Sequence, residues 1–537
     1  MHPAGKQRTR CLPMICGCLL LWAVALPALA HEHDGVGDAK PATVLGHLSF
    51  PTSTHSRPAQ AAFEQGMLWL HLFEYEHAAD AFQAAERLDP GFVMAYWGEA
   101  MTHTHAIWNQ DDPAAARAAL AKLGATVQAR AEKVHTAREQ AYLNAAEKLF
   151  GQGTLRERDN AFLQAMATMS KNYPRDDEAQ LFYSLALLGV TRGERNIPNY
   201  LRAADIAKRV YAHNPLHPGA AHYWIHGMDD PEHAAGALIP ARALSKIAPG
   251  AGHAQHMVSH IFMALGMWDE VVSANVNAIR VIAEERRVAQ RPMVTCGHYA
   301  EWLQYSYYQL GRQHDAQNVL DQCMAESKAA LDWYHAHPDQ SIPGGMSVSR
   351  MKARIDDSLV TMRATAIIES ETERARNAAV VLDVSDVGRS AGWDAFGRGF
   401  AAAKAGDVTA AASDLAALKA IARQPPGTGE TSAQTEYLEI LGLLLQGVIA
   451  QSGGHTDEAI SAATEAARRY DALPFDFGPP VPVKPPHELV GELLLQASRP
   501  KEALAEFDLS LKTAPRRSMS LVGRAKALAA SAAEPGH

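Results

Sequence analysis

Residues 62–90 read AFEQGMLWLHLFEYEHAADAFQAAERLDP, in which two apolar helix patterns flank a short turn before Tyr75. Gly66 stands where the first helix would cross the second, and the aromatic Phe82 of the second helix would fill the space beside it. Pro90 ends the pattern because its ring cannot continue a helix. A single hairpin of this kind cannot bury its apolar face alone, so the stretch predicts further hairpins stacked against it.

The same spacing of small and aromatic residues recurs later in the chain. Further copies stand at residues 265–278, 310–323, 406–418, 447–466 and 491–515. This is the pattern of the tetratricopeptide repeat (TPR), a helical hairpin that stacks into a right-handed superhelix. Strongly alternating β-branched segments are not found, which argues against a sheet protein. We therefore predict an all-α fold, an α-solenoid of TPR-like helical hairpins, with an unrelated helical bundle as the alternative.

The first thirty residues have the composition of an export signal. Basic residues precede an apolar stretch at residues 12–26, and Ala28 and Ala30 have the spacing of a cleavage site. We predict a signal peptide at residues 1–30 and a periplasmic or secreted mature protein; a lipoprotein signal ending at Cys18 is the alternative. No later stretch is long and apolar enough to span a bilayer, so we expect no membrane insertion after signal cleavage.

The rest of the chain divides where its composition changes. Residues 31–56 are polar and predict a flexible leader, residues 57–375 predict an N-terminal TPR-like array with a histidine-rich groove, and residues 376–537 predict a C-terminal TPR-like array. The proline-rich run at residues 474–486 must be extended because proline blocks helix formation. We interpret this run as a spacer in preference to a strap laid over a groove.

Charge and cysteine content restrict the function. The 537-residue chain has a formal net charge of −9 and no stripe of basic residues, which argues against nucleic acid as a partner. Phosphate-binding, dinucleotide-binding and nucleophile-elbow motifs are not found, so we assign no catalytic residue. After signal cleavage only Cys296 and Cys323 remain. They stand near ends of two antiparallel helices that come together, which predicts a disulfide in an oxidising compartment.

Histidines gather in the N-terminal array at helical spacing. His253, His256 and His260 are three and four residues apart, so they share one face of a helix, and Met263 extends that face. In a TPR hairpin these positions of the first helix line the concave groove. The spacing therefore predicts a histidine stripe where such proteins bind their ligands.

Neighbouring hairpins repeat this face. Gly266 and Gly311 mark equivalent turns 45 residues apart, and His222 with His226 forms an i, i+4 pair in the preceding hairpin. Adding the same offset to the stripe gives a second set of groove positions: His298, Glu301, Tyr305 and Tyr308. His71 and His105 are 34 residues apart, one standard repeat length, and are expected on corresponding groove positions.

Two functions fit this groove. The first is an interaction scaffold that binds a peptide or protein partner, with His71, His105, Met263, Tyr305 and Tyr308 lining the groove. The second is a protein or enzyme that binds Zn, Cu, Fe or Ni, because imidazoles at i, i+4 spacing can hold one ion. The predicted ligands are His222, His226, His253, His256, His260, His298 and Glu301. Histidines that only pack the core are the remaining interpretation.

Three strings of residues carry a resemblance to a known group. AHYWIH at residues 221–226, DDPEH at residues 229–233 and the stretch from His253 to Trp268 resemble bacterial exported TPR proteins. The resemblance could extend over the whole mature chain. It implies the repeat fold and an exported location, and it supports these more than any particular chemistry, because the group has no established enzymatic activity.

Overall fold

The computed structural model describes residues 44–533, apart from residues 109, 192–194, 344–345 and 426–431. Within this part of the chain almost all regular structure is helical, and one small sheet pairs β1 with β2 in antiparallel orientation. The predicted all-α fold is confirmed. The predicted signal peptide, and residues 31–43 of the predicted leader, lie outside the described residues.

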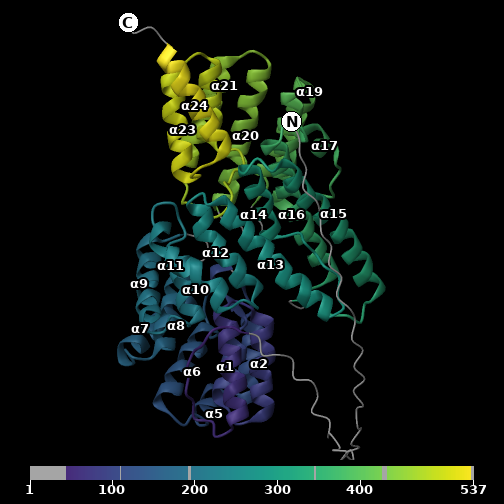
Figure 1. Cartoon of the computed structure of the whole chain (residues 1–537). Helices are drawn as coiled ribbons and strands as arrows, with labels where there is room; N and C mark the ends of the chain where they lie inside the picture. Colours follow the sequence, from purple (N-terminus) through teal and green to yellow (C-terminus); the bar gives the residue numbers. More distant parts are fainter. Residues whose placement is uncertain (1–43, 109, 192–194, 344–345, 426–431, 534–537) are drawn as a thin grey trace, which may run out of the picture. The chain divides into compact units, whose positions relative to one another are not determined.

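Most of the elements follow one another with short connections (Figure 1), and a longer one joins α21 to α22. In chain order they are α1 (Arg57–His71), α2 (Tyr75–Leu88), α3 (Val93–Met101), β1 (Thr104–His105), η1 (Ala106–Trp108), β2 (Gln110–Asp111), α4 (Pro113–Leu123), α5 (Val127–Ala131), α6 (Ala137–Leu149), α7 (Leu155–Asn172), α8 (Asp177–Gly189), α9 (Ile197–His213), α10 (Pro218–Gly227), η2 (Ala234–Ala237), α11 (Leu238–Ile247), α12 (Gly252–Ala264), α13 (Trp268–Val288), α14 (His298–Gln309), α15 (Gln313–Ala336), α16 (Val348–Glu369), α17 (Arg374–Ala379), η4 (Gly388–Ser390), α18 (Ala391–Lys404), α19 (Val408–Ala422), α20 (Ser432–Ser452), α21 (Thr456–Tyr470), α22 (Pro486–Gln496), α23 (Pro500–Thr513) and α24 (Ser518–Ala533).

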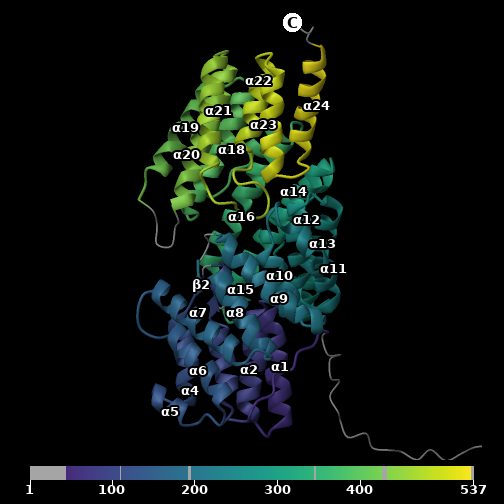
Figure 2. The same ribbon diagram turned by 90° about the vertical axis from the view of Figure 1, so that its left-hand side faces the viewer.

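The six predicted hairpins are present as pairs of packed helices. They are α1 with α2, α12 with α13, α14 with α15, α18 with α19, α20 with α21, and α22 with α23. Each hairpin also packs against helices that follow it, for example α2 against α3 and α13 against α14. The chain is therefore an array of helical hairpins in which sequence neighbours are also neighbours in space, as Figures 1 and 2 show.

Glycines and aromatic rings fit together at the helix crossings as the sequence predicted. Phe82 is fully buried, and a Cβ atom at either Gly66 or Gly98 would overlap its ring. Phe507 has the same relation to Gly491 and Gly523 near the end of the chain. The missing Cβ atoms let two helices approach the ring from both sides.

Replacing Phe507 with alanine is expected to destabilise the C-terminal hairpins by about 3–5 kcal/mol, because the cavity between two glycine-bearing helices cannot close fully. Urea unfolding followed by circular dichroism would measure this loss. Leu528→Ala on α24 is the matched control, since Leu528 is 42% exposed and little stability is expected to be lost there. Equal losses for the two variants would contradict this account of the packing.

The part of the predicted leader that the structure describes is not flexible. Leu45, Leu48 and Phe50 are buried, and the Phe50 ring centroid lies 5.2 Å from that of Phe63 and 5.0 Å from that of Tyr142. The prediction was wrong for residues 44–56 because these apolar side chains gain more from burial than the polar composition of the segment indicated.

The boundary between two arrays at residue 376 stays a prediction; the described helices on both sides of it belong to one compact unit. Arg517, just before α24, is fully buried and lies 2.7 Å from Glu488 of α22 and 2.6 Å from Glu369 of α16. Its guanidinium also donates to the hydroxyl of Tyr305 in α14, at 3.1 Å. These contacts fix the C-terminal helices to the helices that carry the histidines.

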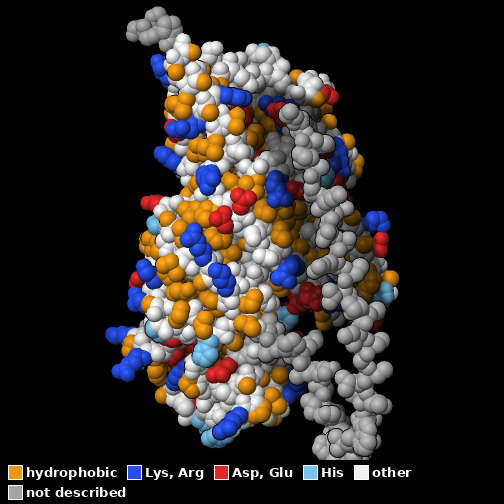
Figure 3. Space-filling view, in the orientation of Figure 1, with side chains coloured by type: hydrophobic (Ala, Val, Ile, Leu, Met, Phe, Trp, Pro, Cys, Tyr) orange, Lys and Arg blue, Asp and Glu red, His pale blue; other side chains and the backbone are white. Residues whose placement is uncertain are grey.

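The remaining structural predictions concern the cysteines and the surface. Cys296 and Cys323 form a disulfide, with Cα atoms 4.7 Å apart. None of the helices in the described part of the chain has the length and apolar character needed to cross a membrane. On the face drawn in Figure 3, Lys and Arg side chains are scattered among Asp and Glu, without a continuous basic stripe.

Candidate metal centre

Three helices bring the predicted histidines together. α10, α12 and α14 lie near one another in both Figures 1 and 2. α10 supplies two histidines, α12 supplies three and α14 supplies one: His222, His226, His253, His256, His260 and His298. Because residues three and four apart share a helix face, each helix presents its histidines to the same interior region.

The six side chains form two groups of three. We call His222, His226 and His253 site A. In site A one ring nitrogen from each histidine lies within 4.8 Å of the other two. The Nε2 atoms of all three are buried and have no hydrogen-bond partner among the described residues. These three buried nitrogens lack a hydrogen-bond partner, and a metal ion bound between them would supply one shared partner for all three.

The protonation of site A also suits a metal ion. The Nδ1 atom of His222 donates a hydrogen bond of 2.7 Å to the backbone carbonyl oxygen of His71, so its Nε2 atom carries a free lone pair. Burial lowers the pKa of His222 to about 3 and lowers the pKa values of His226 and His253 well below 6.5. Neutral imidazole is the form that binds metal, and it prevails here at neutral pH.

Site B consists of His256, His260 and His298, which also have ring nitrogens within 4.8 Å of one another. The Nδ1 atom of His256 donates to Oδ1 of Asn275 at 2.6 Å, and the Nδ1 atom of His260 donates to Asp229 at 2.7 Å. The amide of Asn275 is oriented by its own hydrogen bond, in which Nδ2 donates to a backbone carbonyl of α13. A carboxylate or amide behind an imidazole is the usual arrangement that orients metal-binding histidines.

These hydrogen bonds leave two lone pairs facing each other. Nε2 of His256 lies 3.1 Å from Nε2 of His260, and in each ring the proton belongs to Nδ1. A contact between two acceptors is unfavourable unless a cation lies between them. Two nitrogens bound at about 2.0–2.1 Å to one tetrahedral ion are about 3.3 Å apart, close to the spacing found here.

The two sites are adjacent. The ring centroids of His226 in site A and His260 in site B are 5.7 Å apart, and those of His253 and His256 are 6.2 Å apart. Within site A, the ring centroids of His222 and His253 are 5.2 Å apart. Since the spacing between the sites is close to the spacing within them, the six rings make one continuous cluster.

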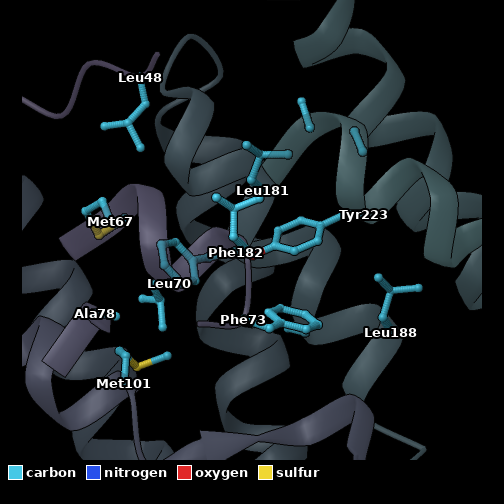
Figure 4. Close-up of a cluster of buried hydrophobic side chains, with 14 of the residues drawn as sticks. Leu48, Met67, Leu70, Phe73, Ala78, Met101, Leu181, Phe182, Leu188 and Tyr223 are labelled. Carbon is cyan, nitrogen blue, oxygen red and sulfur yellow. The ribbon is translucent and has the colours of Figure 1, made fainter. Parts of the chain in front are cut away.

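Phe73 forms a wall of site A from an unfavourable backbone conformation. It has φ of 58° at the turn between α1 and α2, a left-handed conformation that costs a residue with a side chain about 1–2 kcal/mol. Glycine occupies the equivalent turn position in other hairpins, at Gly266, Gly311, Gly406 and Gly454. The Phe73 ring centroid lies 4.4 Å from that of His222 and 5.7 Å from those of His226 and His253. Figure 4 shows Phe73 near Tyr223 in a cluster of buried hydrophobic side chains.

Trp302 and Phe477 cover site B. The Trp302 ring centroid lies 4.5 Å from that of His260, and the Phe477 ring centroid lies 5.2 Å from it on another element. Phe477 belongs to the proline-rich segment 474–486, in which Lys484 is also buried. The favoured interpretation of this segment as a spacer was therefore wrong. It is a strap over the histidine cluster, because Phe477 packs on His260 of α12 and Gly478 lies against the Trp302 ring of α14.

A cavity of about 410 Å³ adjoins the cluster. His226 and His253 of site A and His260 and His298 of site B line it. His298 is the one exposed member of the six, whereas the other five are buried. A small molecule that enters the cavity therefore meets both sites.

A third group shows what a structural histidine cluster looks like. His71, Glu178 and His217 also lie within 4.8 Å of one another. Here both ring nitrogens of His71 are used, by the Tyr223 hydroxyl at 2.8 Å and by Glu178 at 2.6 Å. His217 lies 3.0 Å from Glu178 and accepts from a backbone N–H at the start of α10. No ring nitrogen of this group is left over for a metal ion.

Several residues predicted for the groove or the ligand set lie elsewhere. Glu301 accepts a hydrogen bond from Ser358 at 2.6 Å and is not among the ligand atoms of either site; burial raises its pKa to about 7. Met263, Tyr305 and Tyr308 are buried, and of these Tyr305 lines a cavity of about 590 Å³ together with residues of the proline-rich segment. The C-terminal helices and the neighbouring hairpin cover these side chains.

The two earlier histidines also need correction. His71 is fully buried in the structural cluster, and it contributes to site A only through its backbone carbonyl. His105 is not on a helix, because α3 ends at Met101 and His105 lies in β1, stacked 3.7 Å from Tyr75 between ring centroids. The repeat length of 34 residues was misleading here, since the hairpin is interrupted by the small sheet.

Some residues of the centre were not predicted. Asn275, Trp302 and Phe477 contact the histidines. In the sequence, Asn275 fell within the repeat pattern at residues 265–278 and Phe477 within the run interpreted as a spacer, and Trp302 was not singled out. Asn275 carried a usable signal, because an amide stands at a position of the hairpin pattern where an apolar or small residue is expected. Phe477 had no such signal, since nothing local in the sequence shows that residues more than 200 positions apart meet.

Asp229→Asn is expected to weaken the binding of metal at site B by about 10- to 100-fold, because the carboxylate that orients His260 is lost. Isothermal titration of the metal-free protein would measure the change. Asp230→Asn is the matched control, since Asp230 pairs with Arg195 and His233 and contacts neither site. Equal affinity in the two variants would show that Asp229 does not support a metal ligand.

Comparisons with known proteins add similarity at the level of architecture. Neither the protein-family models nor the curated proteins contain a match to this chain. Among solved structures it is similar to the Cut9–Hcn1 hetero-tetramer of the APC/C (12% identity, 89% of this chain and 78% of that chain, TM-score 0.34). It is also similar to human IFIT1 with PPP-AAAA (14% identity, 88% and 100%, TM-score 0.34) and to yeast Tom70 (10% identity, 87% and 87%, TM-score 0.31). These TM-scores are too low to support an argument from the neighbours. The description of this chain as an array of TPR-like helical repeats therefore rests on its own hairpins, with their glycines at the turns and at the helix crossings.

Proposed function

We propose that this protein binds two transition-metal ions, one in site A and one in site B, within a scaffold of TPR-like hairpins. The observation that carries the proposal is the set of three buried Nε2 atoms of His222, His226 and His253 without partners. A buried polar atom without a hydrogen-bond partner lowers the stability of the folded state by about 1–3 kcal/mol. Three such atoms in one place would therefore make a purely structural cluster strongly destabilising. An ion bound to the three nitrogens would remove this cost in stability.

Site B supports the same proposal through a different observation. The facing lone pairs of His256 and His260 need a cation, and Asp229 behind His260 supplies the negative charge that stabilises one. The structural cluster of His71, Glu178 and His217 also contains a carboxylate, but there Glu178 bonds a ring nitrogen of each histidine and no two lone pairs face each other. In sites A and B ring nitrogens are left for a metal ion, whereas in the His71 cluster every ring nitrogen has a protein partner. This difference supports a metal-binding role for the first two groups and a structural role for the third.

The ligand set limits the choice of metal. Both sites offer neutral imidazoles without thiolates, which suits Cu, Zn, Ni or Fe. A peptide-binding groove made by Met263, Tyr305 and Tyr308 is less well supported, because these side chains are buried. We further propose that the protein is exported and acquires its metal outside the cytoplasm, where the disulfide between Cys296 and Cys323 is stable.

The test is the metal content of protein purified without a polyhistidine tag. Full-length protein would be stripped with a chelator, reloaded with each metal in turn, desalted and analysed by mass spectrometry. We expect about two tightly held ions per chain. His335→Ala with His337→Ala, which removes two exposed histidines, should keep the same content. Protein that retains no ion of any of these metals would contradict the proposal.

A further inference from the structure

Both proposed metal sites border one cavity. The 410 Å³ cavity is lined by two histidines of site A, His226 and His253, and by two of site B, His260 and His298. The rings of His226 and His260 meet edge to face across the boundary of the two sites, with centroids 5.7 Å apart. A ligand of a few atoms in this cavity can therefore contact both ions at once, which is the arrangement of two-metal sites.

The charge of the cavity favours copper. Its lining, within the described residues, contains no Asp or Glu and includes the positive Arg354, so the protein does little to neutralise the charge of the ions there. Among the described residues, Asp229 is the carboxylate bonded to a ring nitrogen of the six histidines, and Glu74 accepts from the backbone N–H of His253. Burying charge without compensation is costly. A pair of Cu(I) ions carries half the positive charge of a pair of Zn(II) ions. After oxidation to Cu(II), an anionic oxygen ligand bound to the pair would offset the added positive charge.

The same lining argues against hydrolysis and for an aromatic substrate. In the part of the lining that the structure describes, no carboxylate is present to act as a general base for hydrolysis. Its walls are instead aromatic at Trp108, Tyr299 and Phe477 and aliphatic along α13. The Tyr299 ring stacks on His256 with a centroid distance of 4.4 Å, and Trp108 meets His253 edge-on at 5.3 Å. Such walls favour a flat, apolar ring.

From these observations we infer that the two sites form a coupled copper pair that oxidises a single-ring diphenol with dioxygen. This inference rests on the proposed metal function. Each diphenol loses two electrons and two protons and becomes a quinone. One dioxygen accepts four electrons and four protons from two diphenols and becomes two waters, with the copper ions passing between Cu(I) and Cu(II). A phenolate oxygen on copper supplies the negative charge that the lining lacks.

The first experiment combines copper analysis with electron paramagnetic resonance on the copper-loaded, oxidised full-length protein. Two Cu(II) ions joined by a bridging oxygen are magnetically coupled and give almost no signal. We expect about two copper ions per chain with a spin count far below two. Two copper ions with a full spin count would overturn the pair and leave the proposed metal function standing. Absence of bound copper, with Zn or another ion retained, would overturn the copper inference alone.

The second experiment measures oxygen consumption by the copper-loaded protein with catechol as the probe. We expect one dioxygen to be consumed for every two catechols. Ile282→Trp, which fills the cavity from α13, should raise the KM for catechol at least tenfold with copper content and spin count unchanged. Val276→Trp, an exposed position on the same helix, is the control and should behave as the parent protein. Coupled copper without oxygen consumption would overturn the oxidation of diphenols.

Discussion

Replacing His256 and His260 together with alanine is expected to lower the metal content from about two ions per chain to about one. The double substitution removes two of the three ligands of site B, and a single imidazole from His298 cannot hold an ion. Site A keeps all its ligands, so its ion should stay. Metal analysis of the desalted, reloaded variant would measure the content directly.

The matched control keeps the number of histidines removed the same. His335→Ala with His337→Ala takes away two exposed imidazoles that belong to neither site, and two ions should remain. Circular dichroism should show nearly unchanged helical content in both variants. Two ions retained in the His256/His260 variant would mean that site B binds no metal, and loss of both ions would mean that the two sites are not separate.

Acid is expected to destabilise the metal-free protein strongly. In the folded state burial holds the pKa of His222 at about 3 and those of His226, His253 and His256 well below 6.5. In the unfolded chain each histidine takes up a proton near pH 6.5, so below that pH the unfolded state binds more protons. Each buried histidine then lowers the free energy of unfolding by about 1.4 kcal/mol per pH unit, until the pH reaches its folded pKa.

Urea unfolding of the chelator-treated protein at about pH 7.5 and about pH 5.5 would measure this effect. We expect the unfolding midpoint to fall sharply at the lower pH, and we expect bound metal to offset part of the fall because it binds only the folded state. His253→Phe should reduce the pH dependence, since one buried titrating ring is removed. A stability of the metal-free parent that does not change over this pH range would contradict the burial of neutral histidines.

Local patterns were enough to predict the fold and much of the centre. The spacing of Gly66 and Phe82 fixed the first hairpin, and repetition of that spacing located the others. The i, i+4 pairs of α10 and α12, together with the offset between hairpins, brought the six histidines into one region. These predictions succeeded because the period of a helix and the length of a repeat are properties of adjacent residues.

What could not be predicted depends on contacts between distant parts of the chain. Phe477 reaches His260 from the strap, and Arg517 binds Glu369 and Tyr305 from the start of the last helix. Those contacts bury the side chains that the repeat register assigned to an open groove. Glu301 was assigned to the cluster by its offset from His256, yet its side chain turns to Ser358 on α16. The repeat register predicts which face of a helix a residue lies on. Which residues contact that face depends on how later parts of the chain pack, and the register does not show this.

The most direct test of the central claim is an anomalous diffraction map from crystals of the metal-loaded protein. The account predicts two strong peaks, one bonded to Nε2 atoms of His222, His226 and His253 and one bonded to ring nitrogens of His256, His260 and His298, each at about 2.0–2.1 Å. Peaks only at exposed histidines, or no peak within the cluster in fully loaded protein, would contradict it.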